Sequence, residues 1–401
     1  MERTFVEISR HKLIENYQAI QRLVGTSVEI LAVVKADAYG HGAVEVAKAL
    51  EGAGARWFAV TSLPEAIELR RGGVLGRVIV LADVARSDQD ALAEFGLTQM
   101  LHSMDQLHDL DAWLQKQEHT GLGTHLRLGG AAGPGSFSPA DRSPQNGRRS
   151  LHLKFDSGMG RLGFHEACLD EIACLLARRP DLELEGLATH FASAEDLTSG
   201  QTEEQIRRFR RFAAALAARG IHPPFTHLAN SAALVYWPET RASMVRPGLA
   251  LYGYVMPARG ENAPAPPRLQ PVLTWKAQVL SVSDFPAGAP LGYNATYRTE
   301  RPMRIGVVAA GYADGLDRRL SNGGPLLAGG RRVRIVGLVS MDVCLVDLTS
   351  TPHVRAGDYI TILGRDGGES LDAMEIADYC GTIPYEILCG IGKRVPRLYV
   401  D

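Results

Sequence analysis

From residue 10 to about residue 255, short apolar runs alternate with longer segments in which apolar residues recur every three or four positions. The short runs are typical of buried strands, and the longer segments are typical of amphipathic helices. The first helix is predicted to follow an N-cap at Ser9. The longest helix is predicted to start at a capping box made by Thr202 and Gln205 and to end at Gly220.

Eight strand-like runs lie in this region, at residues 29–36, 56–62, 77–83, 97–103, 151–156, 184–191, 225–230 and 243–248. Eight strand–helix repeats in about 245 residues suit a TIM barrel, which is typically ~250 residues long. A doubly wound open sheet is the alternative, but it would hold fewer strands in this length. We therefore predict an α/β chain whose N-terminal domain, residues 10–262, is a (β/α)8 TIM barrel.

After residue 260 the pattern changes. A proline-rich connector, "ENAPAPPRLQP", is followed by short apolar runs that are separated by glycines and Asp-Gly turns. These features predict a mostly β C-terminal domain over residues 263–401, and residues 1–9 are a candidate part of the same domain.

Residues 129–150 fit neither pattern, because they are rich in glycine, serine, proline and arginine. We predict a surface insertion in the barrel there. The insertion separates two candidates for the fifth barrel strand, "THLRL" at residues 124–128 and "LHLKF" at residues 151–155. The apolar pattern alone does not choose between them.

The composition narrows the class of protein. The 401 residues are 45% hydrophobic and carry a net charge of −2, which disfavours a nucleic-acid surface or an anionic membrane as partner. No apolar run approaches the roughly 18 residues of a membrane span, and the N-terminus lacks the apolar segment of a signal peptide. The five cysteines form no CxxC pair and the histidines no HExxH motif, so we expect a cytoplasmic protein without a metal site.

In a TIM barrel the chemistry lies at the C-terminal ends of the strands. Lys35 ends the first strand-like run, directly after four apolar residues. Such a lysine either extends its amine to water or is held in a dry pocket for covalent chemistry. Further polar residues follow the later strands: Lys154, Asp156, Arg161, His190, Asn230, Ser231 and Arg246. Side chains from several strand ends would share one pocket.

The residue types suggest what this pocket binds. Ser231 and the backbone N–H groups near Gly248 and Leu249 follow strands seven and eight, where barrels often bind phosphate. A phosphate site opposite a lysine amine suits pyridoxal phosphate (PLP). A Schiff-base aldolase is the alternative barrel enzyme, but it would carry its lysine on a later strand and would not need the β domain.

Nine motifs occur in an order that resembles the alanine racemase family: "VVKADAYGHG", "LHLKFDSGMGRLGF", "GLATHFASAED", "LANSAA", "MVRPGLALYG", "GYNATY", "GYADGLDRRLSN", "GLVSMD" and "KRVPR". The resemblance covers nearly the whole chain except residues 129–150. In such enzymes the K-x-D-(S/T)-G-M-G-R run directly follows the fifth strand, so the resemblance selects residues 151–155 as that strand.

The resemblance implies a PLP-dependent isomerase that interconverts L-alanine and D-alanine and supplies D-alanine for the bacterial cell wall. Lys35 would bind PLP as a Schiff base, and the reaction would pass through a PLP aldimine by a two-base mechanism. Lys35 would be the base on one face, and Tyr293 of the partner subunit in a homodimer would be the base on the other. His190 would connect Tyr293 to Arg246, and Arg246 would face the pyridine nitrogen. A guanidinium keeps its proton, so the pyridine nitrogen beside it would stay unprotonated and the ring would withdraw electrons less strongly. This favours racemisation over decarboxylation or transamination.

The other roles are also implied by the resemblance. Lys154 would be carbamylated and would hold Arg161, which contacts the cofactor and the substrate; an ordinary ion pair between Lys154 and Asp156 is the alternative. The remaining cofactor-binding residues, most of them at the phosphate, would be Tyr39, Asn230, Ser231, Gly248, Leu249 and Tyr385. Tyr312 and Tyr385 would narrow the mouth of the site, and Met341 of the partner would lie beside the substrate carboxylate. The alternative for Tyr312 and Met341 is core packing.

Two other functions remain open. A racemase of broader specificity would need a wider mouth, and Tyr312 and Tyr385 argue against that. A PLP-carrying homeostasis protein would resemble the barrel alone, without a β domain.

Overall fold

The computed structural model describes residues 2–119 and 148–401. The strand candidate at residues 124–128 and most of the predicted insertion at residues 129–150 lie outside the described residues. The chain forms two compact units. The larger contains Ile14–Ala38 and Ala43–Leu269, and the smaller contains the residues up to Leu13, Tyr39–Gly42 and Gln270–Asp401.

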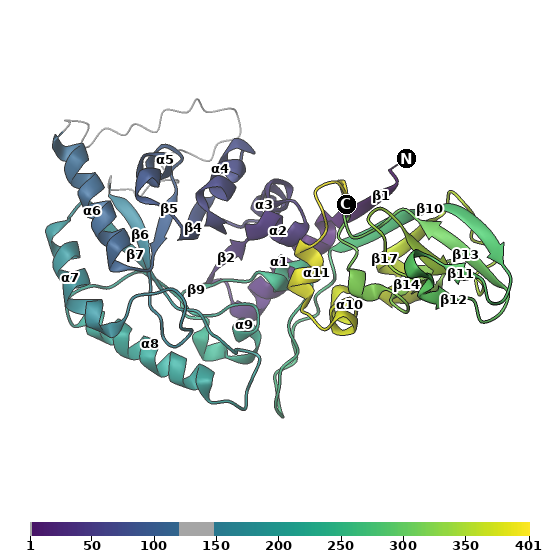
Figure 1. The fold of residues 1–401 in the computed structure, drawn as a ribbon. Coiled ribbons are helices and arrows are strands. Elements are labelled where there is room, and N and C mark those ends of the chain that lie inside the picture. Colours follow the sequence, from purple (N-terminus) through teal and green to yellow (C-terminus); the bar gives the residue numbers. More distant parts are fainter. Residues whose placement is uncertain (1, 120–147) are drawn as a thin grey trace. The chain divides into compact units, whose positions relative to one another are not determined.

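The larger unit is built on a sheet of eight parallel strands in the order β8-β7-β6-β5-β4-β3-β2-β9 (Figure 1). Two hydrogen bonds join its first and last strands: Thr226 N–H donates to Ser243 Oγ at 2.7 Å, and Arg246 N–H donates to the Ala229 carbonyl at 2.9 Å. The predicted eight-stranded barrel is therefore confirmed, with residues 149–154 as its fifth strand. The strands are β2 (Glu29–Val33), β3 (Trp57–Ser62), β4 (Arg77–Asp83), β5 (Thr98–Leu101), β6 (Arg149–Lys154), β7 (Leu182–Ala188), β8 (Phe225–His227) and β9 (Met244–Val245).

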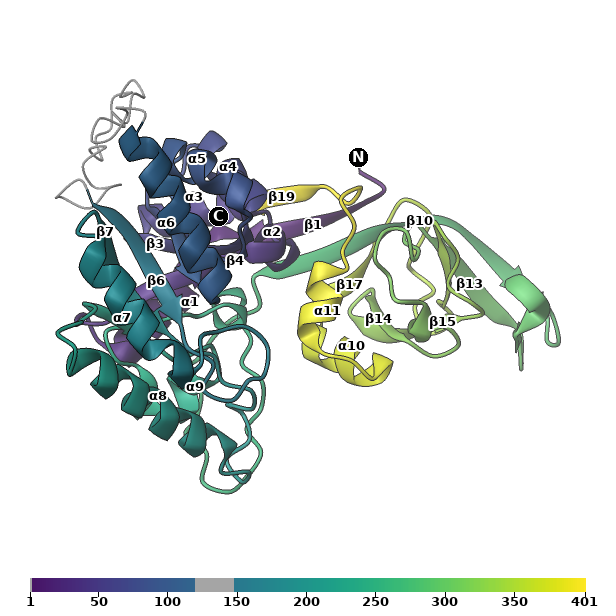
Figure 2. The ribbon, with the colours of Figure 1, turned by 60° about the vertical axis from the view of Figure 1, so that its left-hand side comes forward.

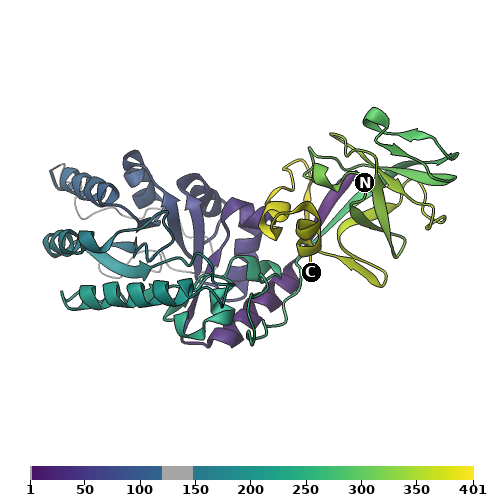
Figure 3. The same ribbon diagram turned by 60° about the horizontal axis from the view of Figure 1, so that its bottom comes forward.

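Helices cover the outside of these strands, and Figure 3 shows three of them, α6, α7 and α8, in a row. Each buries one apolar face against the barrel, as an amphipathic helix should. The helices of this region are α1 (Arg10–Val24), α2 (Lys35–Gly40), α3 (Ala43–Gly52), α4 (Leu63–Arg71), α5 (Gln89–Glu94), α6 (Met104–His119), α7 (Leu169–Arg178), α8 (Gln201–Ala217) and α9 (Ala233–Tyr236).

The capping box predicted for α8 is wrong. Helix α8 already begins at Gln201, so Thr202 and Gln205 lie inside it and are buried. Thr202 Oγ1 donates to the Ser193 carbonyl at 3.2 Å, and Gln205 Nε2 donates to the His190 carbonyl at 3.0 Å. The two side chains therefore hold the loop after β7 instead of capping the helix.

The smaller unit is mostly β, as predicted for the C-terminal part of the chain. Six antiparallel strands, β10-β13-β16-β15-β14-β17, close into a ring because β17 also pairs with β10. Strand β1 pairs antiparallel with β10 and parallel with β19 (Figure 2). The elements are β1 (Thr4–Ser9), β10 (Leu273–Phe285), β11 (Pro290–Leu291), β12 (Tyr297–Arg298), β13 (Met303–Val308), β14 (Pro325–Ala328), β15 (Arg331–Val336), β16 (Cys344–Asp347), β17 (Tyr359–Asp366), β18 (Glu369–Leu371), α10 (Ala373–Cys380), α11 (Pro384–Cys389) and β19 (Arg397–Val400). In the described part of the chain, no helix is long and apolar enough to cross a membrane.

Candidate active site

Lys35 lies at the C-terminal end of β2, where it opens α2, and the backbone after it is unusual. Ala36, Asp37, Ala38 and Tyr39 have φ angles of 51°, 52°, 53° and 55°, so α2 is a short left-handed turn. For residues with a Cβ this conformation costs roughly 1–2 kcal/mol each. Such a run persists only where its surroundings hold it, and strained backbone of this kind is typical of functional sites.

Two carboxylates hold this turn. Glu65 Oε1 accepts the N–H of Ala36 at 2.7 Å, while Glu65 Oε2 accepts the N–H of Thr61 at the end of β3, also at 2.7 Å. Asp37 Oδ1 accepts the N–H of Ala43, the first residue of α3, at 2.7 Å. The backbone next to Lys35 is thereby tied to the neighbouring strand and to the next helix.

Arg246, just after β9, is buried and its guanidinium is fixed by neutral acceptors. Nη1 donates to the carbonyl of His227 and to its Nδ1, the latter at 3.1 Å. Nη2 donates to the Thr189 carbonyl at 2.5 Å and to the Leu228 carbonyl at 3.1 Å, and it lies 3.4 Å from Nδ1 of His190. In the described part of the chain, Nε makes no hydrogen bond and Arg246 no ion pair. Nε–H therefore remains as a donor for a ligand.

Burial lowers the pKa of Arg246 to about 10, so the guanidinium is still protonated at neutral pH. Burial, and then the charges of Arg161 and Arg246, lower the pKa of Lys154 to about 8, and Lys35 contributes less. The pKa of His190 is held well below 6.5 by burial and then by the charges of Arg246, Lys154, Arg161 and Lys35. Arg161, Arg246 and Lys35 therefore act on Lys154, and all four cations act on His190, at one end of the barrel, which suits an anionic ligand.

Asp156 forms no ion pair with this cluster in the described part of the chain, although its charge raises the pKa of Lys154. Its carboxylate accepts N–H groups of the following turn, at 3.0 Å from Gly158, 2.8 Å from Met159, 3.2 Å from Gly160 and 3.1 Å from Arg161. Burial alone would raise the pKa of Asp156, but these four hydrogen bonds lower it. The alternative ion pair with Lys154 is not found among the contacts of the described residues, and Asp156 instead shapes the loop that carries Arg161.

Ser231 and the start of the short 3₁₀ helix Leu249–Tyr252 form an oxygen-binding turn after β8 and β9. The N–H groups of Gly248 and Ala250 both donate to Ser231 Oγ, at 3.0 Å and 3.1 Å. With both N–H groups directed at Ser231 Oγ, the Ser231 O–H can donate to a phosphate oxygen at this turn. Asn230 is used differently, because its Oδ1 accepts the N–H of Ala233, the first residue of α9, at 2.9 Å.

The smaller unit contains the remaining predicted residues. The ring centroids of Tyr39 and Tyr385 lie 5.8 Å apart. The pKa of Tyr39 is raised, mainly by burial and next by the nearby Tyr385. By contrast, Tyr293, Tyr312 and Met341 are 67%, 44% and 53% exposed in the single chain. Core packing, the alternative for Tyr312 and Met341, is therefore wrong.

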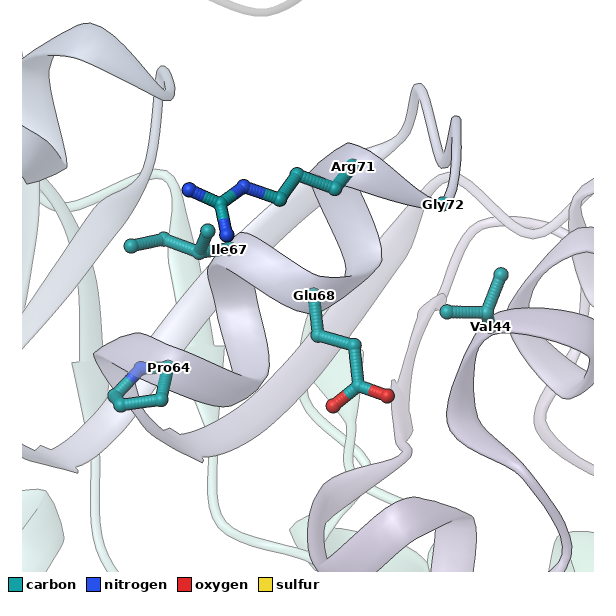
Figure 4. A pocket seen from close by; sticks show the side chains of 6 residues that line it. All are labelled: Val44, Pro64, Ile67, Glu68, Arg71 and Gly72. Atoms are coloured by element: carbon teal, nitrogen blue, oxygen red, sulfur yellow. The ribbon is translucent and has the colours of Figure 1, made fainter.

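A hollow on the outside of the larger unit carries none of the predicted residues. It lies on helices α3 and α4 (Figure 4). Its lining consists of Val44, Pro64, Ile67, Glu68, Arg71 and Gly72. The candidate site is therefore the cation cluster at the strand ends and not this hollow.

Comparison with known proteins agrees with this geometry. Residues 8–256 match the family model "Alanine racemase, N-terminal domain", and residues 272–399 match "Alanine racemase, C-terminal domain". The chain belongs to the alanine racemase family. Its expected enzyme class, an isomerase, is confirmed with the family.

Relatives of this family match the chain over its length. The alanine racemase of Symbiobacterium thermophilum is 38% identical over 399 residues, which cover 100% of this chain and 97% of the relative. A crystal structure of alanine racemase from Bacillus anthracis with bound L-Ala-P is 34% identical, with a TM-score of 0.85 and coverage of 100% and 96%. The alanine racemase of Bartonella henselae with covalently bound pyridoxal phosphate is 28% identical, with a TM-score of 0.82 and coverage of 100% of both chains.

The site residues fit PLP. An amine at the end of β2, a cluster of cations, the Ser231 hydroxyl and the remaining Arg246 Nε–H offer partners for an aldehyde, a phosphate and a ring nitrogen. Sequence reasoning missed three buried residues around Arg246: Glu185, His152 and His227. The two histidines and the glutamate lie in apolar strand runs. A polar residue in such a run was the only sign in the sequence that these side chains have a role.

Proposed function

We propose that this alanine racemase family member interconverts L-alanine and D-alanine with PLP, as a homodimer whose active sites combine residues of both copies. The cluster of Lys35, Lys154, Arg161 and Arg246 around His190 is the observation that carries the proposal. It offers an anionic cofactor and an amino-acid carboxylate a site with excess positive charge. The covalently bound pyridoxal phosphate of the Bartonella henselae relative supports the choice of cofactor.

Three parts of the chain would hold PLP. Lys35 Nζ would bind its aldehyde carbon, the turn at Ser231 and Gly248 its phosphate, and Arg246 Nε–H its ring nitrogen. Tyr39, Leu249, Asn230 and Tyr385 stay predicted cofactor-binding residues. When bound, PLP supplies an electron-withdrawing ring that stabilises negative charge at the Cα of alanine.

Arg246 selects the reaction type. A guanidinium whose pKa stays near 10 keeps its proton at neutral pH and cannot leave it on the ring nitrogen. The ring then withdraws electrons less strongly than one protonated by a carboxylic acid. This suits the exchange of one proton at Cα and disfavours transamination.

Lys35 and Tyr293 would be the two bases. For one enantiomer, Lys35 Nζ takes the Cα proton and Tyr293 Oη of the second copy gives one to the opposite face; for the other enantiomer the roles reverse. Arg246 can only donate, so Nδ1 of His190 accepts and its proton lies on Nε2. Nε2–H can then donate to the Tyr293 oxygen and stabilise the phenolate. The exposure of Tyr293 in the single chain supports a role across a dimer interface.

Lys154 would be carbamylated. A lysine whose pKa is near 8 has a sizeable neutral fraction at neutral pH, and its nitrogen can add to CO₂ with release of one proton. The resulting carbamate would be an anion beside Arg161. A carbamate signal in ¹³C NMR after incubation with ¹³CO₂, absent in Lys154→Ala, would support this modification; no signal in the wild type would refute it.

The cell-wall supply of D-alanine and the cytoplasmic location stay predictions. A broader racemase is the second candidate, although Tyr312 and Tyr385 would leave little room beyond a methyl side chain. A PLP homeostasis protein is less well supported, because residues 272–399 match the family's second domain.

The test follows the chirality of L-alanine by circular dichroism, with the PLP-loaded protein. We expect the wild type to produce the racemate and Lys35→Ala to be inactive and to lose the visible absorbance of bound PLP. Lys48→Ala, an exposed lysine on α3, is the matched control and should behave as wild type. If the loaded wild type leaves L-alanine unchanged, the proposed function is wrong.

A further inference from the structure

Three buried side chains extend from Arg246 into the barrel interior. His227 Nδ1 lies 3.1 Å from Arg246 Nη1, and His227 Nε2 lies 2.8 Å from Nδ1 of His152. His152 Nε2 in turn lies 3.5 Å from Oε2 of Glu185, a longer electrostatic contact. All four side chains are buried, and the reaction proposed above uses only Arg246.

The donors and acceptors in this series can run in one direction only. Arg246 has no acceptor, so Nδ1 of His227 must accept and the proton of His227 must lie on Nε2. His227 Nε2–H then donates to His152 Nδ1, which places the proton of His152 on Nε2, facing the Glu185 carboxylate. Burial holds the pKa of His227 well below 6.5 and lowers that of His152, so both rings are neutral at neutral pH. The two tautomers are therefore fixed from both ends.

The barrel is shaped around this series. Strand β7 has one extra residue against β6, because Leu151 pairs with Leu184 and His152 pairs with Gly186. The extra residue is Glu185, and a bulge of this kind re-aims a side chain. Gly186 leaves room for the imidazole, since a Cβ there would lie only 2.1 Å from His152 Nδ1.

Glu185 is itself anchored and ionised. Both of its oxygens accept hydrogen bonds from Arg77, the one on Oε2 at 2.6 Å, and the Arg77 guanidinium lies 4.2 Å from the Trp57 ring. Burial would raise the pKa of Glu185, but the contact with His152 and the charge and hydrogen bonds of Arg77 lower it. The series therefore ends on a permanent acceptor that cannot rotate away.

We propose that Glu185 is a positioning residue for the racemase site, acting through His152 and His227 to hold the Arg246 guanidinium in one orientation. The carboxylate keeps the proton of His152 on Nε2, and so keeps Nδ1 of His227 open as an acceptor for Arg246. This inference rests on the proposed function only for the role of Arg246; the tautomers can be tested without it.

The first experiment is ¹⁵N NMR of the imidazoles in the PLP-loaded wild type, with the two signals assigned from His152→Gln and His227→Asn. Between about pH 6 and pH 9 we expect Nδ1 of both rings to be unprotonated and Nε2 to carry the proton. A proton on Nδ1 of His227 overturns the proposal. Because this readout needs no turnover, it distinguishes a failure of the proposal from a failure of the proposed function.

The second experiment compares Glu185→Gln with Glu183→Gln, two residues earlier on the same strand. In Glu185→Gln we expect mixed tautomers, a shifted pH midpoint of the PLP visible band, and a kcat that falls about tenfold with KM nearly unchanged. Glu183→Gln should match the wild type. If Glu185→Gln folds and leaves the imidazole signals and the PLP band unchanged, Glu185 has no positioning role; if it does not fold, the wild-type spectrum alone decides.

Discussion

Acidification is expected to destabilise the protein through three buried imidazoles, those of His152, His190 and His227. Burial is the largest cause that lowers the pKa of each. In the unfolded chain a histidine titrates near pH 6.5. As pH falls through that value, the unfolded chain therefore binds protons that the folded chain does not. Stability present above about pH 6.5 is lost as pH falls, and the loss continues down to the lower pKa of the folded state.

The size of this loss follows from linkage. At one pH unit below the unfolded pKa, each imidazole that stays neutral in the folded protein removes about 1.4 kcal/mol. Three such groups remove at most about 4 kcal/mol between about pH 7.5 and pH 5.5, out of a total that is typically 5–15 kcal/mol. Asp156 and Glu185 act in the same direction, but only near their ordinary pKa values of 3.8 and 4.5. Above about pH 5, the change in stability on acidification therefore reports on the three histidines and not on these two carboxylates.

The assay is urea unfolding of the PLP-loaded protein, followed by circular dichroism at a fixed protein concentration across this window. His227→Asn keeps an oxygen acceptor for Arg246 but does not titrate, so the loss of stability on acidification should shrink by roughly a third. His222→Asn, at an exposed position, is the matched control and should keep the wild-type slope. A stability that does not change between about pH 7.5 and pH 5.5, or an unchanged slope in His227→Asn, would refute the reasoning.

Three further outcomes are expected. Gly186→Ala should lower the free energy of unfolding by about 2–4 kcal/mol, because the new Cβ would meet His152. Gly52→Ala is the control: no atom lies within 4 Å of the new Cβ, and the change should be less than about 0.5 kcal/mol. The urea midpoint measures both. Glu65→Gln should weaken PLP binding about tenfold in an absorbance titration, because a charged acceptor of the left-handed turn is lost, and unaltered binding would contradict that role. Tyr293→Phe should keep the visible band of PLP but exchange the Cα proton with D₂O for only one enantiomer, as ¹H NMR can follow; equal exchange of both would exclude a phenol base.

The strands of the barrel were predictable because each is a short apolar run buried on both faces, and burial of that kind leaves a direct trace in the sequence. The left-handed turn after Lys35 was not predictable, because alanine disfavours positive φ and a single aspartate only tolerates it. Hydrogen bonds with Glu65, 29 residues from Ala36, and with Ala43 at the start of α3 are among the contacts that hold the turn in place. Local sequence cannot report such contacts.

The residues that support Arg246 were hidden for a related reason. A bulge shifts Glu185 out of the regular alternation of β7, so the period of the strand gives no sign of where its side chain points. For Thr202 and Gln205 the local pattern gave a wrong prediction. Their spacing matches a capping box, but both side chains bind the loop that carries His190. In each case tertiary contacts decided a position that local spacing could not.

The pairing of β1 with β10 bears on how the chain is made. Strand β1 leaves the ribosome first, but its antiparallel neighbour at Leu273–Phe285 is synthesised only after the whole barrel. At typical rates of synthesis the interval is roughly 15–50 s, during which the edge of β1 has no neighbour from its own sheet. The parallel strand β19, at Arg397–Val400, comes later still. A nascent chain released before Arg397–Val400 would therefore contain a finished barrel and a strand β1 with one edge open to pairing with other chains.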